Sequence, residues 1–173
     1  AQWDTGVGVV AVPDERWLRC DIKSLNLLGN ILAKQKAKEA GCYEAIMIRD
    51  NMVTEGSSSN FVIVKDGVLW TYPTGNLILK GVTRTRVLEE IVPANGLSVL
   101  EKAFTLDFAK KADEAFLTGT TTEIMPIVTI DGSRLPMAKL DRLPKKFKKD
   151  TKTRSPKNAA WLNTVLRHEA VPA

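Results

Sequence analysis

The chain has 173 residues, 44% of them hydrophobic and 26% charged, which is enough for one domain with a sizeable core. It contains no apolar run near the ~18–20 residues that a membrane-spanning helix needs, and no secretory signal pattern opens it. Two cysteines, Cys20 and Cys42, are too few for a disulfide scaffold and lack metal-ligand spacing. We therefore expect a cytoplasmic protein with reduced thiols, without a metal site and without membrane contact.

The formal net charge of +5 is concentrated near the carboxyl-terminal end of the sequence. Residues 139–173 carry ten basic and three acidic side chains, a net +7, whereas residues 1–138 sum to −2. A basic segment of this kind can bind nucleic acid, but this one has few aromatic residues to stack on bases, so we do not expect a nucleic-acid partner. We expect one domain over 1–138 and a basic tail over 139–173 that is disordered or atypical.

Short apolar and β-branched runs between turn signals predict strands along most of the chain. In chain order, strands are expected over residues 5–12, 16–20, 45–48, 52–55, 61–64, 68–72, 97–102, 115–117 and 124–130. Pro13-Asp14 ends the first of them, and Asp66-Gly67 is the signal of a tight hairpin between two later ones.

Two principal helices interrupt these strands. The first is predicted from Ser24 to Gly41, because Leu25, Leu28 and Leu32 recur at helical spacing. The second is expected from Thr83 to Pro93, and two short helices are expected over residues 106–111 and, in the tail, over 159–169. This order of elements predicts an α+β fold, a β-rich pseudo-barrel with flanking helices.

The most informative residue is Lys23, which stands where an extended segment turns into a helix. About thirty residues later comes the run Thr54 to Asn60, which holds Glu55 and three serines. A lysine amine beside a carboxylate and hydroxyls is typical of sites where a lysine forms a Schiff base with a carbonyl compound. A pyridoxal phosphate site needs such an amine, an acid at the ring nitrogen, an apolar wall and donors for the phosphate.

Candidates for each of these parts are present. Lys23 can supply the amine, Glu55 the acid and Leu79 the wall, with Arg16 as a candidate partner that orients Glu55. Each also has an ordinary reading when taken alone: Glu55 as an exposed strand-end carboxylate, Arg16 as a surface arginine and Leu79 as a core residue. One motif alone does not decide whether these residues form a cofactor site or have ordinary structural roles.

Two turns can bind an anion. Gly81-Val82-Thr83 leads into a predicted helix, where free backbone N–H groups and the helix dipole favour negative charge. The hydroxyl of Thr83 adds a donor, although it also suits an ordinary helix cap. Thr118 to Thr122, directly after an apolar strand, gives a second hydroxyl-rich turn.

Four stretches occur in an order that resembles the larger, cofactor-binding domain of the D-amino acid aminotransferases, which belong to the fold-type-IV, class IV aminotransferases that use pyridoxal phosphate. The stretches are residues 14–28, 54–60, 77–84 and 120–126. The resemblance implies that Lys23 forms the Schiff base, that Glu55 partners the pyridine nitrogen and that Leu79 backs the ring.

The resemblance also implies that Val82, Thr83 and Thr120 hold the cofactor phosphate. Gly119 stands where a serine is usual in the family, which removes one hydroxyl from this phosphate site. Family members carry a further amino-terminal domain, which is absent from this sequence and which supplies most of the contacts to the substrate carboxylate. We therefore expect partial or impaired activity from this chain, and either a homodimer or a partner that supplies the missing domain.

The activity implied by the resemblance is reversible transfer of an amino group between a D-amino acid, of the D-alanine type, and a 2-oxo acid. Aminodeoxychorismate lyase and branched-chain aminotransferase are alternatives of the same fold. A third alternative is a non-catalytic fragment or interaction module that keeps the fold and binds through its basic tail.

Overall fold

A computed structural model of the chain describes residues 2–94 and 98–136. Within these residues one mixed sheet of nine strands forms the centre, in the order β3-β2-β1-β8-β7-β4-β5-β6, with β9 paired to β8. The strands are β1 (Val7–Pro13), β2 (Glu44–Arg49), β3 (Met52–Gly56), β4 (Asn60–Lys65), β5 (Val68–Thr71), β6 (Ser98–Glu101), β7 (Glu114–Gly119), β8 (Glu123–Ile130) and β9 (Ser133–Arg134). The helical elements are α1 (Gln2–Thr5), α2 (Leu28–Glu39), α3 (Val82–Arg86), the π-helical turn η1 (Val87–Ile91), α4 (Val92–Ala94) and α5 (Leu106–Lys110).

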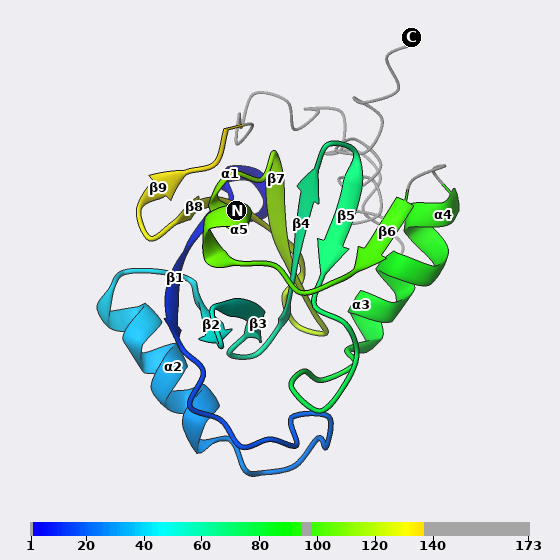
Figure 1. Cartoon of the computed structure of the whole chain (residues 1–173). Helices are drawn as coiled ribbons and strands as arrows, with labels where there is room; N and C mark the ends of the chain where they lie inside the picture. Colours follow the sequence, from blue (N-terminus) through cyan, green and yellow to red (C-terminus); the bar gives the residue numbers. More distant parts are fainter. Residues whose placement is uncertain (1, 95–97, 137–173) are drawn as a thin grey trace, which may run out of the picture.

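The sheet is curled, and helices cover it at two places (Figure 1). α2 packs on β1 and β2, whereas the continuous helical run of α3, η1 and α4 packs near β7 and β6. No helix in the described residues is both long and apolar enough to cross a membrane. The α+β fold expected from the sequence is therefore confirmed in its general form.

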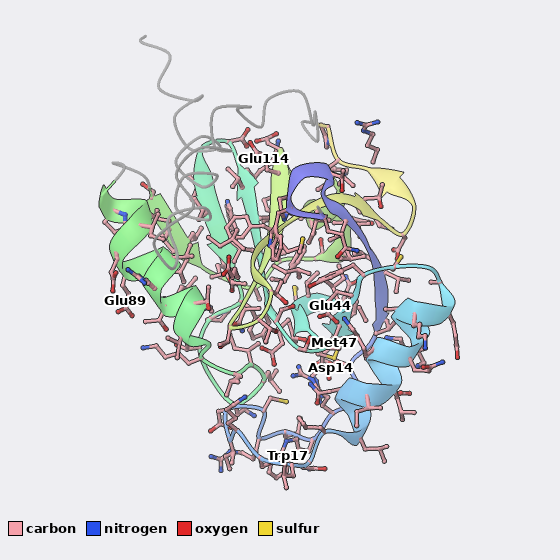
Figure 2. All side chains as sticks on the ribbon, turned by 180° about the vertical axis from the view of Figure 1, so that it is seen from behind. Asp14, Trp17, Glu44, Met47, Glu89 and Glu114 are labelled. Carbon is pink, nitrogen blue, oxygen red and sulfur yellow. The ribbon has the colours of Figure 1, made fainter. Side chains whose placement is uncertain are left out.

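The pairing of β1 determines where the chain must cross the sheet. β1 runs parallel to both β2 and β8, whereas β7 pairs antiparallel with β8 and β4. Parallel neighbours cannot be joined by a tight hairpin, so the chain leaves β1 at Asp14 and returns through α2. The loop of residues 14–27 consequently passes across the lower end of the molecule in Figure 1, and Figure 2 shows Trp17 on its outer edge.

Buried side chains form separate clusters on the faces of the sheet. The largest includes Phe61, Leu117 and Ile127, whose side chains are at most 3% exposed. On the side of α3 and η1, Phe116 and Val87 belong to a second cluster. Because side chains alternate along a strand, neighbouring residues of β7 serve the two faces in turn.

Two expectations about residues 16–39 were wrong. Residues 16–20 form an irregular loop rather than a strand, and α2 begins at Leu28 rather than at Ser24. The hydroxyl of Ser24 accepts a hydrogen bond from the backbone N–H of Asn26 at 3.2 Å, a local turn that competes with a helix.

The apolar face of α2 is also reversed with respect to the expectation. The small residues Ala33 and Ala37 are buried against the sheet. Leu25 is 96% exposed, Leu28 67% and Leu32 47%, so these leucines do not face the core of this chain. The expectations for the tail, including a helix over 159–169, lie outside the described residues.

Candidate functional site

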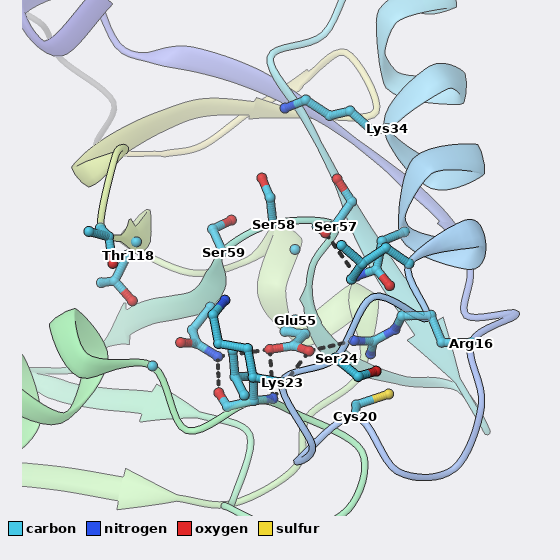
Figure 3. Close-up of a pocket in the computed structure, with 18 of the residues that line it drawn as sticks. Arg16, Cys20, Lys23, Ser24, Lys34, Glu55, Ser57, Ser58, Ser59 and Thr118 are labelled. Carbon is cyan, nitrogen blue, oxygen red and sulfur yellow. Dashed lines mark hydrogen bonds and ion pairs between the residues drawn. The ribbon is translucent and has the colours of Figure 1, made fainter.

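A pocket of about 480 Å³ opens where the loop of residues 14–27 faces β3, the start of α3 and the end of β7 (Figure 3). Segments more than 100 residues apart in the sequence meet at this place. All residues nominated from the sequence line it, namely Arg16, Lys23, Glu55, Leu79, Val82, Thr83, Gly119 and Thr120. The fold therefore brings the separate motifs together around one cavity.

Glu55 lies on β3 with its side chain only 7% exposed. Its carboxylate accepts hydrogen bonds from Arg16 Nη1, from Asn60 Nδ2 at 2.9 Å and from the backbone N–H of Leu79 at 3.2 Å. Burial raises the pKa of Glu55 to about 7, against the lowering effect of the Arg16 guanidinium. The reading of Glu55 as an exposed strand-end carboxylate is excluded by this burial.

Arg16 is buried as well, so it is not a surface arginine. Its Nε and Nη2 atoms donate to the two oxygens of Asp14 at 2.9 and 2.8 Å, which leaves Nη1 for Glu55. Burial raises the pKa of Asp14, but hydrogen bonds from Arg16 and Arg49 outweigh it and bring that pKa down to about 2. The guanidinium thus joins two carboxylates that approach it from different elements.

Lys23 lies on the loop and is exposed to the pocket. The loop is held in place by the turn that precedes Leu79, because the backbone N–H of Cys20 donates to the carbonyl of Asn76 at 2.8 Å. Asn76 returns a side-chain hydrogen bond to the carbonyl of Leu18 at 2.9 Å. Lys23 makes no hydrogen bond or ion pair with the described part of the chain, so its amine is available to a ligand.

The start of α3 has the features of an anion site. Gly81 precedes the helix in an extended conformation, and no side chain caps the first N–H groups. A Cβ atom at position 81 would lie 2.3 Å from Oδ1 of Asn60, so any other residue there would displace the Asn60 amide that donates to Glu55. Val82 is 81% exposed, which leaves this end of the helix open on the pocket side.

The end of β7 completes the wall next to α3. Gly119 has room for a side chain, since a Cβ there would meet its nearest neighbour, Cβ of Thr122, at 3.5 Å. The serine that the resemblance implied at this position would therefore meet no steric obstacle. Thr118, one residue earlier, is buried and lines the pocket, and its Oγ1 has no partner among the described residues.

A family model described as amino-transferase class IV matches residues 5–130. The chain belongs to the class IV aminotransferase family. It is 52% identical over 130 residues to the D-alanine aminotransferase of Bacillus licheniformis, an alignment that covers 75% of this chain and 46% of that protein. The D-alanine aminotransferase of Listeria innocua is 53% identical over 131 residues, with 76% and 45% covered.

Solved structures of the same family share the fold. The branched-chain aminotransferase of Thermoproteus uzoniensis, crystallised with norvaline, superposes with a TM-score of 0.73 and 33% identity, covering 92% of this chain and 50% of that one. The branched-chain amino acid aminotransferase of Thermobaculum terrenum, in its PLP-bound holo-form, gives 0.70 and 31%, covering 75% and 44%. This class IV aminotransferase chain thus spans about half the length of the curated relatives it matches.

Sequence reasoning missed two buried carboxylates that hold lining residues of this class IV aminotransferase pocket in place. Glu44, at the start of β2, is fully buried and accepts hydrogen bonds from the hydroxyls of Ser57 and Ser58, which both line the pocket. Asp14 was read only as part of a turn. No local pattern marks either carboxylate, because Glu44 meets its serines across two strands and Asp14 meets its second arginine, Arg49, at the end of β2.

The stability of this class IV aminotransferase chain should fall between pH 4.5 and neutrality. Glu55 titrates at 4.5 in an unfolded chain but near 7 in the fold, so the folded state binds more protons between these values. The contribution of Glu55 is therefore greatest below pH 4.5 and is lost as the pH rises through 7, by roughly 3 kcal/mol in total.

Urea unfolding followed over this pH range measures the fall, and Glu55→Gln should flatten it because the amide cannot lose a proton. The pKa of Asp14 is lowered from 3.8 to about 2, so its contribution to stability is lost as the pH falls through that range. This effect has the opposite sign to that of Glu55, but it lies below the pH range of the experiment. If the stability of Glu55→Gln fell equally steeply with pH, the loss of stability would come from other groups.

Proposed function

We propose that this chain is the cofactor-binding part of a D-amino acid aminotransferase, which moves an amino group reversibly between a D-amino acid of the D-alanine type and a 2-oxo acid. The observation that supports this most is the meeting of Lys23, Glu55 and the open start of α3 around one pocket. These parts come from separate motifs, and each supplies a different need of pyridoxal phosphate chemistry.

The residues present fit pyridoxal 5′-phosphate. The uncapped N–H groups after Gly81, together with the hydroxyls of Thr83 and Thr120, suit its phosphate. Leu79 offers an apolar wall for its ring and Glu55 a carboxyl for the ring nitrogen. When bound, this cofactor supplies an electron sink for charge that develops at the α-carbon of the substrate.

The chain's own groups have distinct tasks in the transfer. With the cofactor bound, Lys23 Nζ would hold it through its aldehyde carbon. Once the substrate amine has taken the place of Lys23, the freed Nζ would accept the proton of the substrate α-carbon and donate it to the former aldehyde carbon, as amino-group transfer requires. Glu55 would keep a proton at the ring nitrogen of the bound cofactor. Arg16, Asn60 and the backbone N–H of Leu79 hold the Glu55 carboxylate in position. The backbone donors at the start of α3 would hold the phosphate and thereby orient the cofactor toward Lys23.

The degree of identity favours the D-amino acid reading over the branched-chain one. The two D-alanine aminotransferases match at 52% and 53%, whereas the two branched-chain structures match at 33% and 31%. A purely structural module has no need for an unpaired lysine beside a buried carboxylate. The presence of both in one pocket therefore favours an enzyme.

An exposed apolar strip beside the pocket supports a protein partner. It comprises Trp17, Leu18, Ile22, Leu25, Leu27, Leu28, Ile31 and Leu32, each at least 39% exposed. So many large apolar side chains in one segment are unusual on a free surface. We propose that a second copy of the chain, or a chain carrying the rest of the relatives' length, covers this strip in the cytoplasm.

The proposal is tested by loading the protein with pyridoxal 5′-phosphate and offering D-alanine with 2-oxoglutarate, while pyruvate is followed. We expect cofactor uptake and faster use of D-alanine than of L-alanine. Since the chain spans about half of its relatives, its turnover alone should lie below the ordinary enzyme range of ~1–10³ s⁻¹.

Two outcomes would contradict the proposal. Faster transfer from branched-chain L-amino acids than from D-alanine would favour the branched-chain reading. A protein that takes up no cofactor, although it is folded, would support the non-catalytic module.

A further inference from the structure

Asp14 is a buried carboxylate that the proposed mechanism does not use. It follows β1 directly, and its backbone N–H continues the pairing with β2 by donating to the carbonyl of Ile48 at 2.8 Å. Its side chain is 0% exposed, and Figure 2 shows it in the interior of the molecule. The sheet therefore holds Asp14 in a fixed place, whereas Arg16, two residues later, belongs to the irregular loop.

The two oxygens of Asp14 are saturated with donors. Oδ1 accepts from the backbone N–H of Arg16 at 3.2 Å and from its Nε at 2.9 Å, and it lies 3.1 Å from Nη2 of Arg49. Oδ2 accepts from Arg16 Nη2 at 2.8 Å and from the hydroxyl of Thr54 at 3.0 Å. Arg16 and Arg49 thus both contact the Asp14 carboxylate, whereas a single donor would be enough for a carboxylate that only stabilises a turn.

The two hydrogen bonds from Arg16 to Asp14 determine which guanidinium nitrogen of Arg16 faces the pocket. A guanidinium has a fixed planar fork, so binding of the Nε and Nη2 edge leaves Nη1 pointing away from Asp14. In this structure Nη1 donates to Glu55. The orientation is supported further because Nη2 also donates to the carbonyl of Leu77 at 3.1 Å.

We propose that Asp14 is a positioning residue of the pocket. It fixes the guanidinium of Arg16 so that Nη1 faces Glu55, and its negative charge partly neutralises Arg16, so that the guanidinium attracts the Glu55 carboxylate less strongly. Without Asp14, Arg16 and Arg49 would leave Glu55 beside an uncompensated positive charge. Glu55 would then hold its proton less well. Asp14 therefore keeps the Glu55 carboxyl able to take up and release a proton near neutral pH, as burial alone favours.

The charged or titratable groups around Glu55 and its pocket come from four places in the fold. They are Asp14 at the end of β1, Arg16, Cys20 and Lys23 in the loop, Arg49 at the end of β2 and Lys34 in α2. Asn60 from β4 and the N–H of Leu79 are neutral donors. Among these groups, only Asp14 touches Arg16 with an opposing charge on the side away from Glu55.

The test is a carbon-13 NMR titration of the glutamate carboxyls in the 173-residue protein, without cofactor or substrate. The Glu55 signal is assigned by its loss in Glu55→Gln. In Asp14→Asn we expect the pKa of Glu55 to fall by about one pH unit, because a negative charge is removed from the far side of Arg16. A purely structural role predicts the opposite, since a loosened Arg16 would leave Glu55 with less compensation and raise its pKa.

Asp21→Asn is the matched control. Asp21 accepts the same two-pronged contact from Arg19, at 3.0 and 2.9 Å, but this pair is exposed and does not touch Glu55. The titration of Glu55 should be unchanged in this variant. An unchanged or raised pKa of Glu55 in folded Asp14→Asn would overturn the proposal.

If Asp14→Asn does not fold, Arg49→Gln carries the test. Removal of this cation leaves Asp14 to draw on Arg16 alone, so the pKa of Glu55 should rise, and an unchanged value would overturn the proposal. The role of Glu55 toward the cofactor rests on the proposed function, but the titration does not. Failure to find amino-group transfer would therefore leave the positioning role intact, and the reverse also holds.

Discussion

Borohydride reduction of the protein loaded with pyridoxal 5′-phosphate should fix the pyridoxyl group on the peptide that contains Lys23, and Lys23→Ala should abolish this labelling. Lys23 is exposed to the pocket and has no partner within the described residues, so its amine is free to react with an aldehyde. Its loop is tied to Asn76 by two hydrogen bonds, which holds the amine near the anion site. Peptide mass mapping after digestion measures the result.

Lys34→Ala is the matched control for this experiment. Lys34 lines the same pocket, but its Nζ donates to the carbonyl of Tyr43 at 2.6 Å and lies 3.4 Å from a carboxylate oxygen of Glu44. Its loss should leave the labelling of Lys23 intact. A label found on Lys34, or spread over the basic tail at Lys145 and Lys146, would show that Lys23 is not the reactive amine.

Arg16→Ala should destabilise the fold by about 3–5 kcal/mol, the usual cost of removing one partner from a buried ion pair. The side chain of Arg16 is 3% exposed, and it joins Asp14 to Glu55. Arg49 can still compensate Asp14 at 3.1 Å, but Glu55 would keep only neutral donors. Urea unfolding monitored by tryptophan fluorescence measures the change.

The pH dependence of this loss gives a second check. Glu55 can escape the cost of an unpaired charge by taking up a proton, so the destabilisation should be smaller below the pKa of about 7 than above it. Arg19→Ala is the control, because the ion pair of Arg19 with Asp21 is exposed and its removal should not move the unfolding midpoint. Equal midpoints for Arg16→Ala and the unchanged protein would show that the buried pair adds nothing to stability.

Local chemistry was sufficient for most of the strands and for the hairpin turn between β4 and β5, but not for residues 16–20. Asp66 and Gly67 adopt positive φ values of 50° and 73°, as the hairpin signal between β4 and β5 required. Apolar runs such as residues 45–48 became buried strands, since a run this short between turn signals favours a strand over a helix. The helix predicted from Thr83 was also confirmed, and it begins one residue earlier, at Val82, directly after Gly81.

The separate motifs of the site could likewise be found in the sequence. Lys23, Glu55 and Gly81 each carry a local signal, namely a lysine before a helix, an acid before serines and a glycine before an uncapped helix. Their roles toward a cofactor stay predictions. Their meeting around one pocket could not be derived from spacing, because it depends on the crossing of the loop between β1 and α2.

By itself, the sequence determined most of the strands and helices and the residue types that chemistry requires, since both depend on neighbours along the chain. Only the tertiary structure decided that residues 16–20 form a loop, that α2 buries alanines rather than leucines, and that Arg16 is buried. The physical reason is that each of these features depends on contacts between residues far apart in the sequence. Arg16, for example, can be buried only because both Asp14, two residues away, and Glu55, 39 residues away, bind its guanidinium, and the contact with Glu55 exists only in the folded chain.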